Sequence, residues 1–565
     1  MAPTEPFSSV SASISSIFTI IPPRHIALLV LAYGVFIMLN RYIIQPYTSP
    51  IKNLAGPRRT DDWNPWVGHL RPIIKGLPGE AAAKWIEQFG TVFRYDGIFG
   101  APRIMVADPV AIQYILNHTE IFQKDDMTRR FLRRILGEGL LNVEGADHRR
   151  QRKVMNPAFG PQLIRDHHLP IFYDKAYQLR DVLQEKLSTT LPDATTSDKS
   201  QGRRIEISRL LGKTTLDVIG LAGFGYEFDS LHDPENELAL ALELMLSAGQ
   251  NPSPLHILQE ILPGGQYLPS KRIATQKASL ETTHRIGKAL VEEKKAAVRA
   301  GEASIEKGKG KDLLSMVVRA NMDPDLKESQ RMSDAEVIAT IQTFVLAGAE
   351  TSSTALTWAS WVLACRPDVQ DKLREECEAV PEEQPSMNDL DGLPYLDAFV
   401  HEVLRIYSPV PQTRRDAISE TVVPLGHPMK GRDGKMIESI VVPKNTPCML
   451  AVLNVNTSKE IWGPDAAEFK PERWMNKEQN PASESIPGVW GSQMTFIGGP
   501  RACIGFRFSL IEVKALLFML IRNFAFAEAV PTESVIRKTS IVTRPFIKGE
   551  EAAGYQMPVL LRSLA

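Results

Sequence analysis

Apolar residues recur with a helical spacing along most of this chain, and the pattern predicts a mainly α-helical protein that also carries small β-sheets. Residues 91–109 are an exception, because their sequence around a Gly/Pro turn indicates two short strands. A helical pattern begins after Pro109, and helices dominate from there to about residue 470. The expected fold class is therefore α+β with helices in the majority.

The best defined helix is expected to begin at Ser333. Glu336 follows Ser333 at the spacing of a capping box. The segment then stays apolar almost all round until Arg366, which predicts a central buried helix. Gly348 lies in its middle, where glycine costs about 1 kcal/mol relative to alanine. Glu350 lies nearby, and an acid in so apolar a helix is costly unless it is paired or used.

Three stretches interrupt the helical pattern. Residues 189–204 and 301–312 are polar and of low complexity, which predicts exposed loops. Residues 247–270 are apolar but broken by proline and glycine. A mobile lid, a surface that dips into a membrane and a packed loop all remain open for this last stretch.

The N-terminal region predicts a membrane anchor. Residues 26–39 carry no charge, and the span from about 25 to 44 reaches the ~20 residues that a membrane helix needs. A cleaved signal peptide would have a basic segment before it, and none is present. A buried core helix is a weaker alternative so near a terminus. We therefore expect residues 1–50 to form a lumenal tail and a transmembrane helix.

Positive charges follow the expected span. Lys52, Arg58 and Arg59 lie on its C-terminal side, which places residues 51–565 in the cytosol by the positive-inside rule. Lys+Arg number 65 and Asp+Glu 66, so the balanced charge argues against a nucleic-acid partner. The four cysteines are too few for a disulfide framework in a chain of 565 residues.

One of these cysteines, Cys503, lies in the run "FIGGPRACIGF", just before an apolar helical segment. Free backbone N–H groups and the helix dipole favour a thiolate at such a position. Glycines permit a close approach of the backbone, and Arg501 can face an anion. A planar, anionic, metal-bearing cofactor such as haem with a thiolate ligand meets these demands. A catalytic cysteine nucleophile and a plain turn remain as alternatives.

The loop resembles the haem-binding loop of the cytochrome P-450 superfamily, the haem-thiolate monooxygenases. The resemblance rests on Phe496, Gly499, Arg501, Cys503 and Gly505 at the family's spacing. Three further segments occur in the family's order and resemble its oxygen-activating helix, its Glu-x-x-Arg helix and its Pro-Glu-Arg segment: "AGAET" at 347–351, "EVLR" at 402–405 and "FKPERW" at 469–474. The resemblance therefore covers nearly the whole chain from about residue 55.

The resemblance implies roles for particular residues. Cys503 would be the axial ligand of a haem b iron, and Phe496, Gly499 and Gly505 would shape the loop that holds the haem. Thr351 and Glu350 would guide protons to bound oxygen.

Spacing supports a groove at Thr351. Ala347 and Gly348 precede Thr351 by four and three residues, so the three share a helix face that a small residue could open into a groove. A threonine bonded back to its own helix is the alternative.

Two further sets follow from the resemblance. Glu402, Arg405 and Arg473 would form a buried structural network rather than a catalytic one. The haem propionates would be held by a second set, in which His148 departs from the family's usual tryptophan: His148, Arg152, Arg415 and Arg501. Within the basic run 148–153, the side chains of Arg149, Arg150 and Lys153 could form a docking surface for an electron donor.

The function implied by the resemblance is that of a microsomal monooxygenase in the endoplasmic reticulum membrane, with a single span and a cytosolic catalytic domain. No flavin or nicotinamide fingerprint is visible, so an NADPH-dependent flavoprotein reductase in the same membrane is the expected partner. A lipophilic substrate is expected, and the fungal-like sequence favours a terpenoid or another secondary metabolite. A haem-thiolate isomerase or dehydratase and a haem-binding sensor or carrier are the alternatives.

Overall fold

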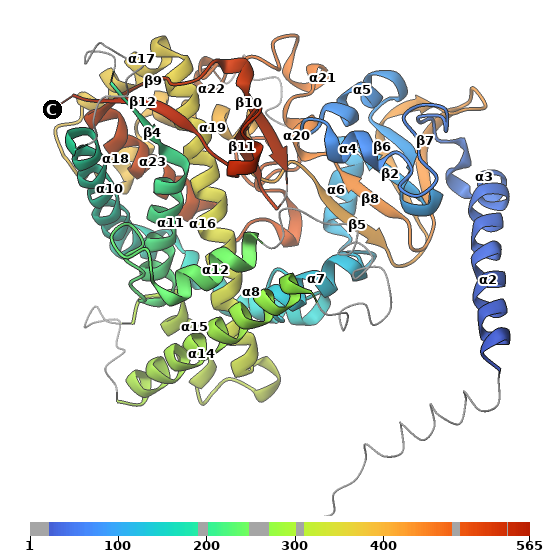
Figure 1. Ribbon diagram of the computed structural model, residues 1–565, viewed down its shortest axis with the longest axis horizontal. Coiled ribbons are helices and arrows are strands. Elements are labelled where there is room, and N and C mark those ends of the chain that lie inside the picture. The colour runs from blue at the N-terminus through green and yellow to red at the C-terminus, as the bar shows by residue number, and fades with distance from the viewer. Residues whose placement is uncertain are drawn as a thin grey trace, which may run out of the picture.

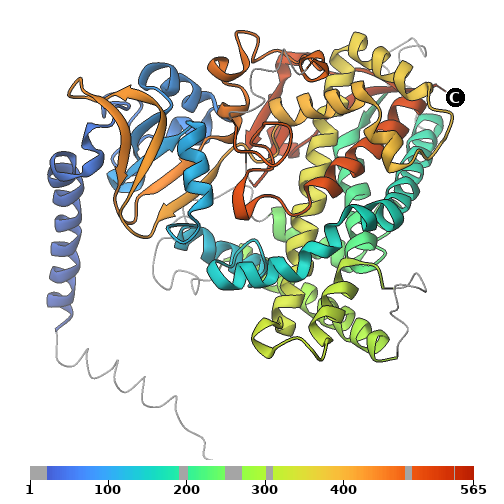
Figure 2. The ribbon, with the colours of Figure 1, turned by 180° about the vertical axis from the view of Figure 1, so that it is seen from behind.

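The structure of the protein is a computed structural model, and it describes residues 22–189, 202–247, 270–300, 310–476, 486–539 and 541–564. The stretch 248–269 and most of the two polar stretches predicted as loops lie outside these ranges. Figures 1 and 2 show a large helical part around α16 and a smaller part built on a sheet, beyond which α2 extends. The expected mainly α-helical class with small sheets is confirmed.

The central helix α16 (Asp334–Cys365) begins and ends where the sequence predicts. Ser333 caps it: the Ser333 hydroxyl accepts from the Glu336 amide at 3.3 Å, and the Glu336 carboxylate accepts from the Ser333 amide at 2.8 Å. Most of its side chains are buried, as expected for a helix that is apolar all round. The yellow ribbon of α16 runs through the middle of the helical part in Figure 1.

The other helices surround α16 or cover the sheet. α11 (Ile207–Phe224) packs along α16, and α23 (Phe506–Asn523) lies between α10 (Leu169–Thr189), α16 and α17 (Pro367–Glu378). Within the described residues of the body, the other α-helices are α4 (Leu70–Lys75), α5 (Glu80–Phe89), α6 (Pro109–Asn117), α7 (Asp126–Leu136), α8 (Gly145–Met155), α9 (Pro161–Leu163), α12 (Glu237–Ser247), α14 (Lys271–Arg299), α15 (Leu313–Met322), α18 (Met387–Asp391), α19 (Pro394–Ile406), α20 (Val452–Asn456), α21 (Lys459–Trp462) and α22 (Glu472–Met475).

The main sheet has five strands in the order β1-β2-β8-β5-β3. Strands β1 (Val92–Asp96) and β2 (Pro102–Val106) pair antiparallel, which confirms the two strands predicted for residues 91–109. β2 pairs in parallel with β8 (Pro447–Leu450), and β8 pairs antiparallel with β5 (Thr413–Ala417). The short strand β3 (Phe122–Gln123) closes the edge beside β5.

Three smaller sheets complete the fold. They are the hairpin of β6 (Thr421–Lys430) and β7 (Met436–Val442), the hairpin of β10 (Val535–Thr539) and β11 (Thr543–Ile547), and a sheet of β4 (Arg203–Glu206), β12 (Pro558–Ser563) and β9 (Phe524–Glu528). The core has two parts, one among the helices around α16 and one between the main sheet and its covering helices. The cysteine loop precedes α23 and contacts both parts of the fold.

The predicted anchor region is helical but interrupted. α2 (Pro23–Leu39) passes into a π-helical segment at Asn40–Ile44 and then into α3 (Gln45–Thr48). Among the residues that the structure describes, none of the helices reaches the length and apolarity needed to cross a membrane. Figure 1 shows α2 standing outside the body, next to the sheet part.

Candidate active site around Cys503

The loop before α23 is held in place by close backbone contacts. The Cys503 amide donates to the Phe496 carbonyl at 3.0 Å, and the Ala502 amide donates to the Gly499 carbonyl at 3.0 Å. A Cβ at Gly498 would lie 1.7 Å from the Pro487 carbonyl oxygen. Gly499 has a φ of +71°, which an L side chain rarely adopts. These two glycines are therefore required by contacts within the protein itself rather than by the approach of a cofactor.

Cys503 is accessible within this short run. It is exposed, although its neighbours Arg501 and Ala502 are buried. Surrounding protein still desolvates the thiol and raises its pKa, while a hydrogen bond from the Gly505 amide and the charge of Arg152 act in the opposite direction. Gly505 also caps α23, so the thiol sits at the positive end of that helix.

The other three cysteines are less suited to bind a metal. Burial raises the pKa of Cys377 to about 12 and that of Cys365 to about 11. Cys448 is fully buried, and its pKa is also raised by burial. Cys503 is the most accessible of the four thiols, in agreement with its predicted role as the ligand.

The middle of α16 has an accessible face. Ala347 is exposed and Thr351, one turn later, is partly exposed, although Phe344 and the residues around it are buried. The Thr351 hydroxyl donates to the Ala347 carbonyl at 2.6 Å. This is a hydrogen bond back to its own helix, which was the alternative considered for Thr351. That bond uses the hydroxyl proton and leaves the Thr351 oxygen able to accept another.

Gly348, which is partly exposed, packs closely against α11. A Cβ at Gly348 would lie 2.9 Å from Cγ1 of Ile219 on α11. The missing side chain of Gly348 therefore allows the close packing of α11 against α16. Ala347 is the more exposed of the two small residues, and a groove beside Thr351 stays a prediction.

Glu350 is paired. Its carboxylate forms an ion pair with Arg544 of β11, and both side chains are mostly buried. The Arg544 guanidinium also lies 3.9 Å from the centre of the Tyr555 ring. The pair explains how an acid is tolerated in an apolar helix, and it means that any proton transfer by Glu350 takes place beside a fixed positive charge.

A second buried acid was not predicted. Glu512 on α23 is 1% exposed and accepts a hydrogen bond of 2.6 Å from Ser352, the residue after Thr351. Ser509 lies 3.2 Å from the Ser352 hydroxyl. Desolvation raises the pKa of Glu512 to about 8, against the smaller effect of the Ser352 bond. The sequence feature that could have indicated this buried acid is a glutamate within an apolar helical segment, as at Glu350.

Ionisable side chains from four parts of the chain gather near the cysteine loop. His148 and Arg152 lie on α8, Arg415 on β5 and Arg501 in the loop, and Lys124 after β3 joins them. Burial, and then the charges of Lys124, Arg152 and Arg415, lowers the pKa of His148 to about 4. The structure thus brings together the four residues predicted to hold propionates. Lys124 belongs to no motif and was missed.

The cluster contains more positive charge than its surroundings neutralise. Burial lowers the pKa of Arg415 to about 10 and that of Lys124 well below its ordinary value. Glu144 pairs with Lys124 at 3.6 Å and with Arg501. Among the described residues no other carboxylate forms an ion pair with these cations. Buried cations are costly without anions, so two propionates of a haem b fit this cluster.

Arg152 links the cluster to the loop. Its guanidinium donates to the Ala502 carbonyl at 2.7 Å, next to Cys503. Arg501 donates to the Phe122 carbonyl at 3.0 Å, which ties the loop to the main sheet. The loop is thereby fixed between α8 and the sheet.

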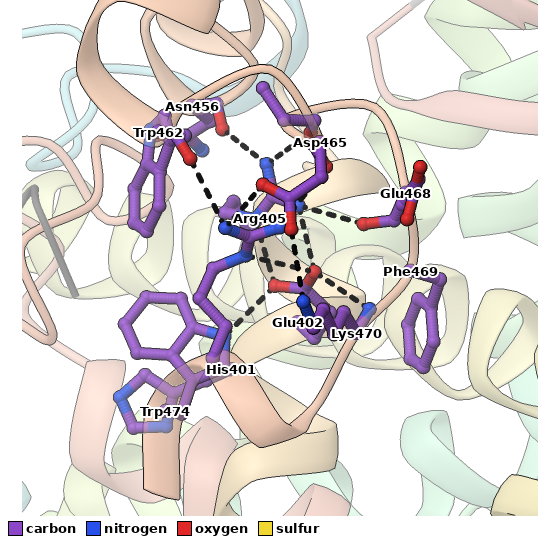
Figure 3. Close-up of polar contacts among 12 residues, drawn as sticks. His401, Glu402, Arg405, Asn456, Trp462, Asp465, Glu468, Phe469, Lys470 and Trp474 are labelled. Carbon is purple, nitrogen blue, oxygen red and sulfur yellow. Dashed lines mark hydrogen bonds and ion pairs between the residues drawn. The ribbon is translucent and has the colours of Figure 1, made fainter. Parts of the chain in front are cut away.

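The predicted network of Glu402, Arg405 and Arg473 is buried. Figure 3 shows Glu402 and Arg405 with their polar neighbours. Arg405 and Glu402 are fully buried and form two parallel hydrogen bonds of 2.7 and 2.8 Å. Arg473 Nε lies 3.6 Å from Glu402 Oε1, and Arg473 also pairs with Asp465 at 3.1 Å. Figure 3 shows Glu402 and Asp465 close to the Arg405 guanidinium.

Arg405 also binds backbone carbonyls at the end of α20 and in the segment that follows it. It donates to the carbonyls of Asn456 at 2.9 Å, Ala466 at 2.6 Å and Glu468 at 3.1 Å. The Asn456 side chain in turn accepts from the Met494 amide at 2.7 Å. This chain of contacts connects α19 to the segment just before the cysteine loop.

Comparisons with known proteins agree with these features. The family model for cytochrome P-450 matches residues 57–546. Cytochrome P-450 monooxygenase 128 of Postia placenta is 41% identical over 534 residues, which cover 93% of this chain and 95% of that protein. Cytochrome P-450 monooxygenase 205 of the same fungus is also 41% identical, over 92% of this chain and 94% of its own length. A ganoderic acid synthetase of Ganoderma lucidum is 32% identical over 91% of this chain and 94% of its own length.

Proposed function

Since this chain belongs to the cytochrome P-450 family, as one of its monooxygenases, we propose that it oxidises a lipophilic small molecule with electrons from NADPH. When bound, haem b supplies reductive activation of dioxygen at a thiolate-ligated iron. The observation that carries the proposal is the exposed Cys503 thiol in a loop braced on both sides by buried networks.

The chain's own residues then have separate roles. Cys503 would ligate the iron, and Phe496, Gly499 and Gly505 would keep its loop in shape. The propionates would be held by four cationic side chains and by His148 as an uncharged donor; the cations are Lys124, Arg152, Arg415 and Arg501. Each cation would donate charge-assisted hydrogen bonds to a carboxylate oxygen.

Thr351 would help to position the proton that is delivered to dioxygen bound in the site. Its Oγ1 lies on the accessible face of α16 and can accept a hydrogen bond while donating to Ala347. Glu350 would pass protons from solvent while it is paired with Arg544.

Electrons would come from an NADPH-dependent flavoprotein reductase. The basic run on α8 offers the exposed side chains of Arg149 and Lys153 for an acidic surface of that partner. Arg150 is not available to the donor, because it is bound to Glu336 at 2.5 Å and to Asp147 at 3.0 Å. The expected docking surface is therefore smaller than the basic run suggests.

The substrate class rests on relatives as well as on the site. A relative named as a ganoderic acid synthetase supports a small organic molecule as the substrate. We propose a terpenoid or another lipophilic secondary metabolite.

We further propose that the N-terminal segment attaches the protein to the endoplasmic reticulum membrane with the body in the cytosol. Large apolar side chains of α2 are exposed, among them Leu28, Leu31 and Phe36. Such a row is costly in water and favourable in lipid. Deletion of residues 1–47 should move the protein from the membrane fraction to the soluble fraction, and a full-length protein that is already soluble would contradict this attachment.

The catalytic proposal is tested with full-length protein, a fungal reductase and NADPH. A panel of terpenes, sterols, fatty acids and aromatic compounds is screened for oxygenated products and for substrate-dependent NADPH consumption. Cys503→Ala should abolish both product formation and the thiolate-type Soret band of the reduced, carbon monoxide-bound form. Cys365→Ala is the matched control and should keep both, since Cys365 lies outside the loop.

The outcomes separate the alternatives. Product formed without oxygen or NADPH would indicate an isomerase or a dehydratase. Haem binding without turnover of any compound under reducing conditions would favour a sensor or carrier. Retention of the thiolate band in Cys503→Ala would remove Cys503 from the site.

A further inference from the structure

A cavity of about 560 Å³ lies at the junction between the N-terminal helices and the sheet part, away from the cysteine loop. Figure 1 shows this junction where α3 meets the part of the fold that contains β2, β6 and β7. Its walls combine aromatic rings with guanidinium groups: Tyr42, Tyr47, Arg58, Arg59, Arg94 and Arg432.

The backbone explains why these arginines meet. The Arg94 amide of β1 donates to the Ala55 carbonyl at 2.9 Å. A Cβ at Gly56 would lie 1.8 Å from the Arg94 carbonyl oxygen, so glycine allows residues 55–57 to run directly against β1. Arg58 and Arg59 follow at once, and the Arg432 amide reaches the Asn53 carbonyl at 2.8 Å from the turn between β6 and β7.

Positive charge exceeds negative charge in the cavity. Asp96 is the single acid among the described residues of its wall. It binds Arg59 at 2.9 Å and lies 3.6 Å from Arg94. Among the described residues, Arg58 and Arg432 form no ion pair and are exposed. One carboxylate therefore faces four guanidinium groups.

Arg94 and Arg59 have guanidinium N–H groups that could bind a further anion. Arg94 is 8% exposed, and within the described part of the chain its guanidinium has an ion pair only with Asp96, at 3.6 Å. Desolvation lowers the pKa of Arg94; the charge of Asp96 opposes this, and the charges of Arg432 and Arg59 add to it. The Arg59 guanidinium lies 4.9 Å from the centre of the Tyr42 ring, and its buried Nη2 has no hydrogen-bond acceptor among the described residues. Buried donors without acceptors are costly, so the cavity is built for an anion.

We propose that this cavity binds the phosphate of an anionic phospholipid headgroup. Guanidinium groups pair with phosphate through parallel hydrogen bonds, and several of them converge here. Tyr42 and Tyr47 are residues typical of the water–lipid boundary. α2, with its exposed apolar side chains, ends at Leu39, three residues before Tyr42. Acyl chains of a bound lipid could therefore continue along α2.

This inference rests in part on the membrane attachment proposed above, so the test is made without a membrane. Full-length protein in neutral detergent is titrated with a fluorescent short-chain phosphatidic acid, and binding is followed by fluorescence anisotropy. Unlabelled phosphatidic acid, short-chain phosphatidylcholine and inorganic phosphate compete in separate arms. Failure of membrane attachment would appear in the fractionation experiment and would leave this titration unaffected.

The test variant is the double substitution Arg58→Gln with Arg432→Gln, because both side chains are exposed and unpaired among the described residues and their loss should not disturb folding. Arg299→Gln with Lys548→Gln removes the same charge from exposed positions outside the cavity. The haem-thiolate spectrum verifies that both variants are folded.

We expect the double variant to weaken binding of phosphatidic acid by about a hundredfold, roughly tenfold for each guanidinium that can no longer bind the phosphate. The control should change the dissociation constant less than about threefold. Phosphatidic acid should compete well and phosphatidylcholine poorly. Equal competition by phosphatidylcholine or by inorganic phosphate would overturn the assignment to an anionic lipid, and so would unchanged binding by Arg58→Gln with Arg432→Gln.

Discussion

Replacement of Arg405 by alanine should remove most of the stability of the folded protein. Arg405 has no exposed surface, and its guanidinium makes two hydrogen bonds to Glu402 and three to backbone carbonyls. Its charge also lies 5.0 Å from the centre of the Trp462 ring. Alanine would retain none of these contacts.

The loss of unfolding free energy can be estimated from the groups that would lose Arg405 as a partner, which are Glu402 and three backbone carbonyls. Glu402 would keep the Lys470 amide at 3.0 Å, the Trp474 indole at 2.9 Å and the more distant Arg473 at 3.6 Å. Removing one partner of a buried ion pair costs about 3–5 kcal/mol. Buried carbonyls without donors cost about 1–3 kcal/mol each. The sum approaches the roughly 5–15 kcal/mol by which domains are stable.

The assay is thermal unfolding of purified holoprotein, together with the yield of the thiolate-type spectrum. Arg405→Ala should give little holoprotein, and Arg405→Lys should be intermediate, because lysine keeps the charge but not the parallel hydrogen bonds. Arg285→Ala is the control: it removes an ion pair with Glu237 whose partners are more than half exposed, and it should leave unfolding unchanged. A normal yield and melting temperature for Arg405→Ala would refute the reasoning.

Three further predictions concern the site. Thr351→Ala should keep the thiolate spectrum but lower the ratio of product to NADPH consumed and release hydrogen peroxide, because positioned proton transfer contributes ~10²–10⁴ in rate. Thr351→Ser should restore the ratio, and a normal ratio for alanine would exclude Thr351. Glu512 keeps a proton in the folded state up to its pKa of about 8, whereas the unfolded chain loses it near 4.5, so stability falls as pH rises between these values. Glu512→Gln should therefore gain in melting temperature over the native chain from about pH 5 to about pH 8, and parallel curves would contradict the raised pKa. Arg415→Gln should speed haem loss to apomyoglobin about tenfold or more without destabilising the haem-free form, because it removes a buried cation that has no carboxylate partner among the described residues. Unchanged haem loss would separate Arg415 from the propionates.

The sequence was sufficient where the relevant residues are near each other in the chain. The capping box at Ser333 and Glu336 needs only three residues of separation, and it forms as expected. Glu402 and Arg405 face each other because they are three residues apart on one helix. The cysteine loop was recognisable for the same reason, since its glycines, Arg501 and Cys503 lie within one short run.

Spacing alone cannot tell which side of a helix meets a neighbour. Gly348 and Ala347 are adjacent and both small, and either could have opened a groove beside Thr351. Only the packing of α11 shows that Gly348 faces Ile219. The same holds for Arg150, whose charge looked free until Glu336, 186 residues later, was found beside it.

What the sequence by itself determined is therefore local: the helices and first strands, the loop that presents Cys503, and the paired residues within α19. The tertiary structure decided which distant groups share one environment. Lys124 and Glu144 join Arg501 from more than 350 residues away, and Arg544 on β11 neutralises Glu350 on α16. The reason is physical. Helix propensity and capping act over a few residues, whereas desolvation and charge pairing depend on what surrounds a group after the whole chain has packed.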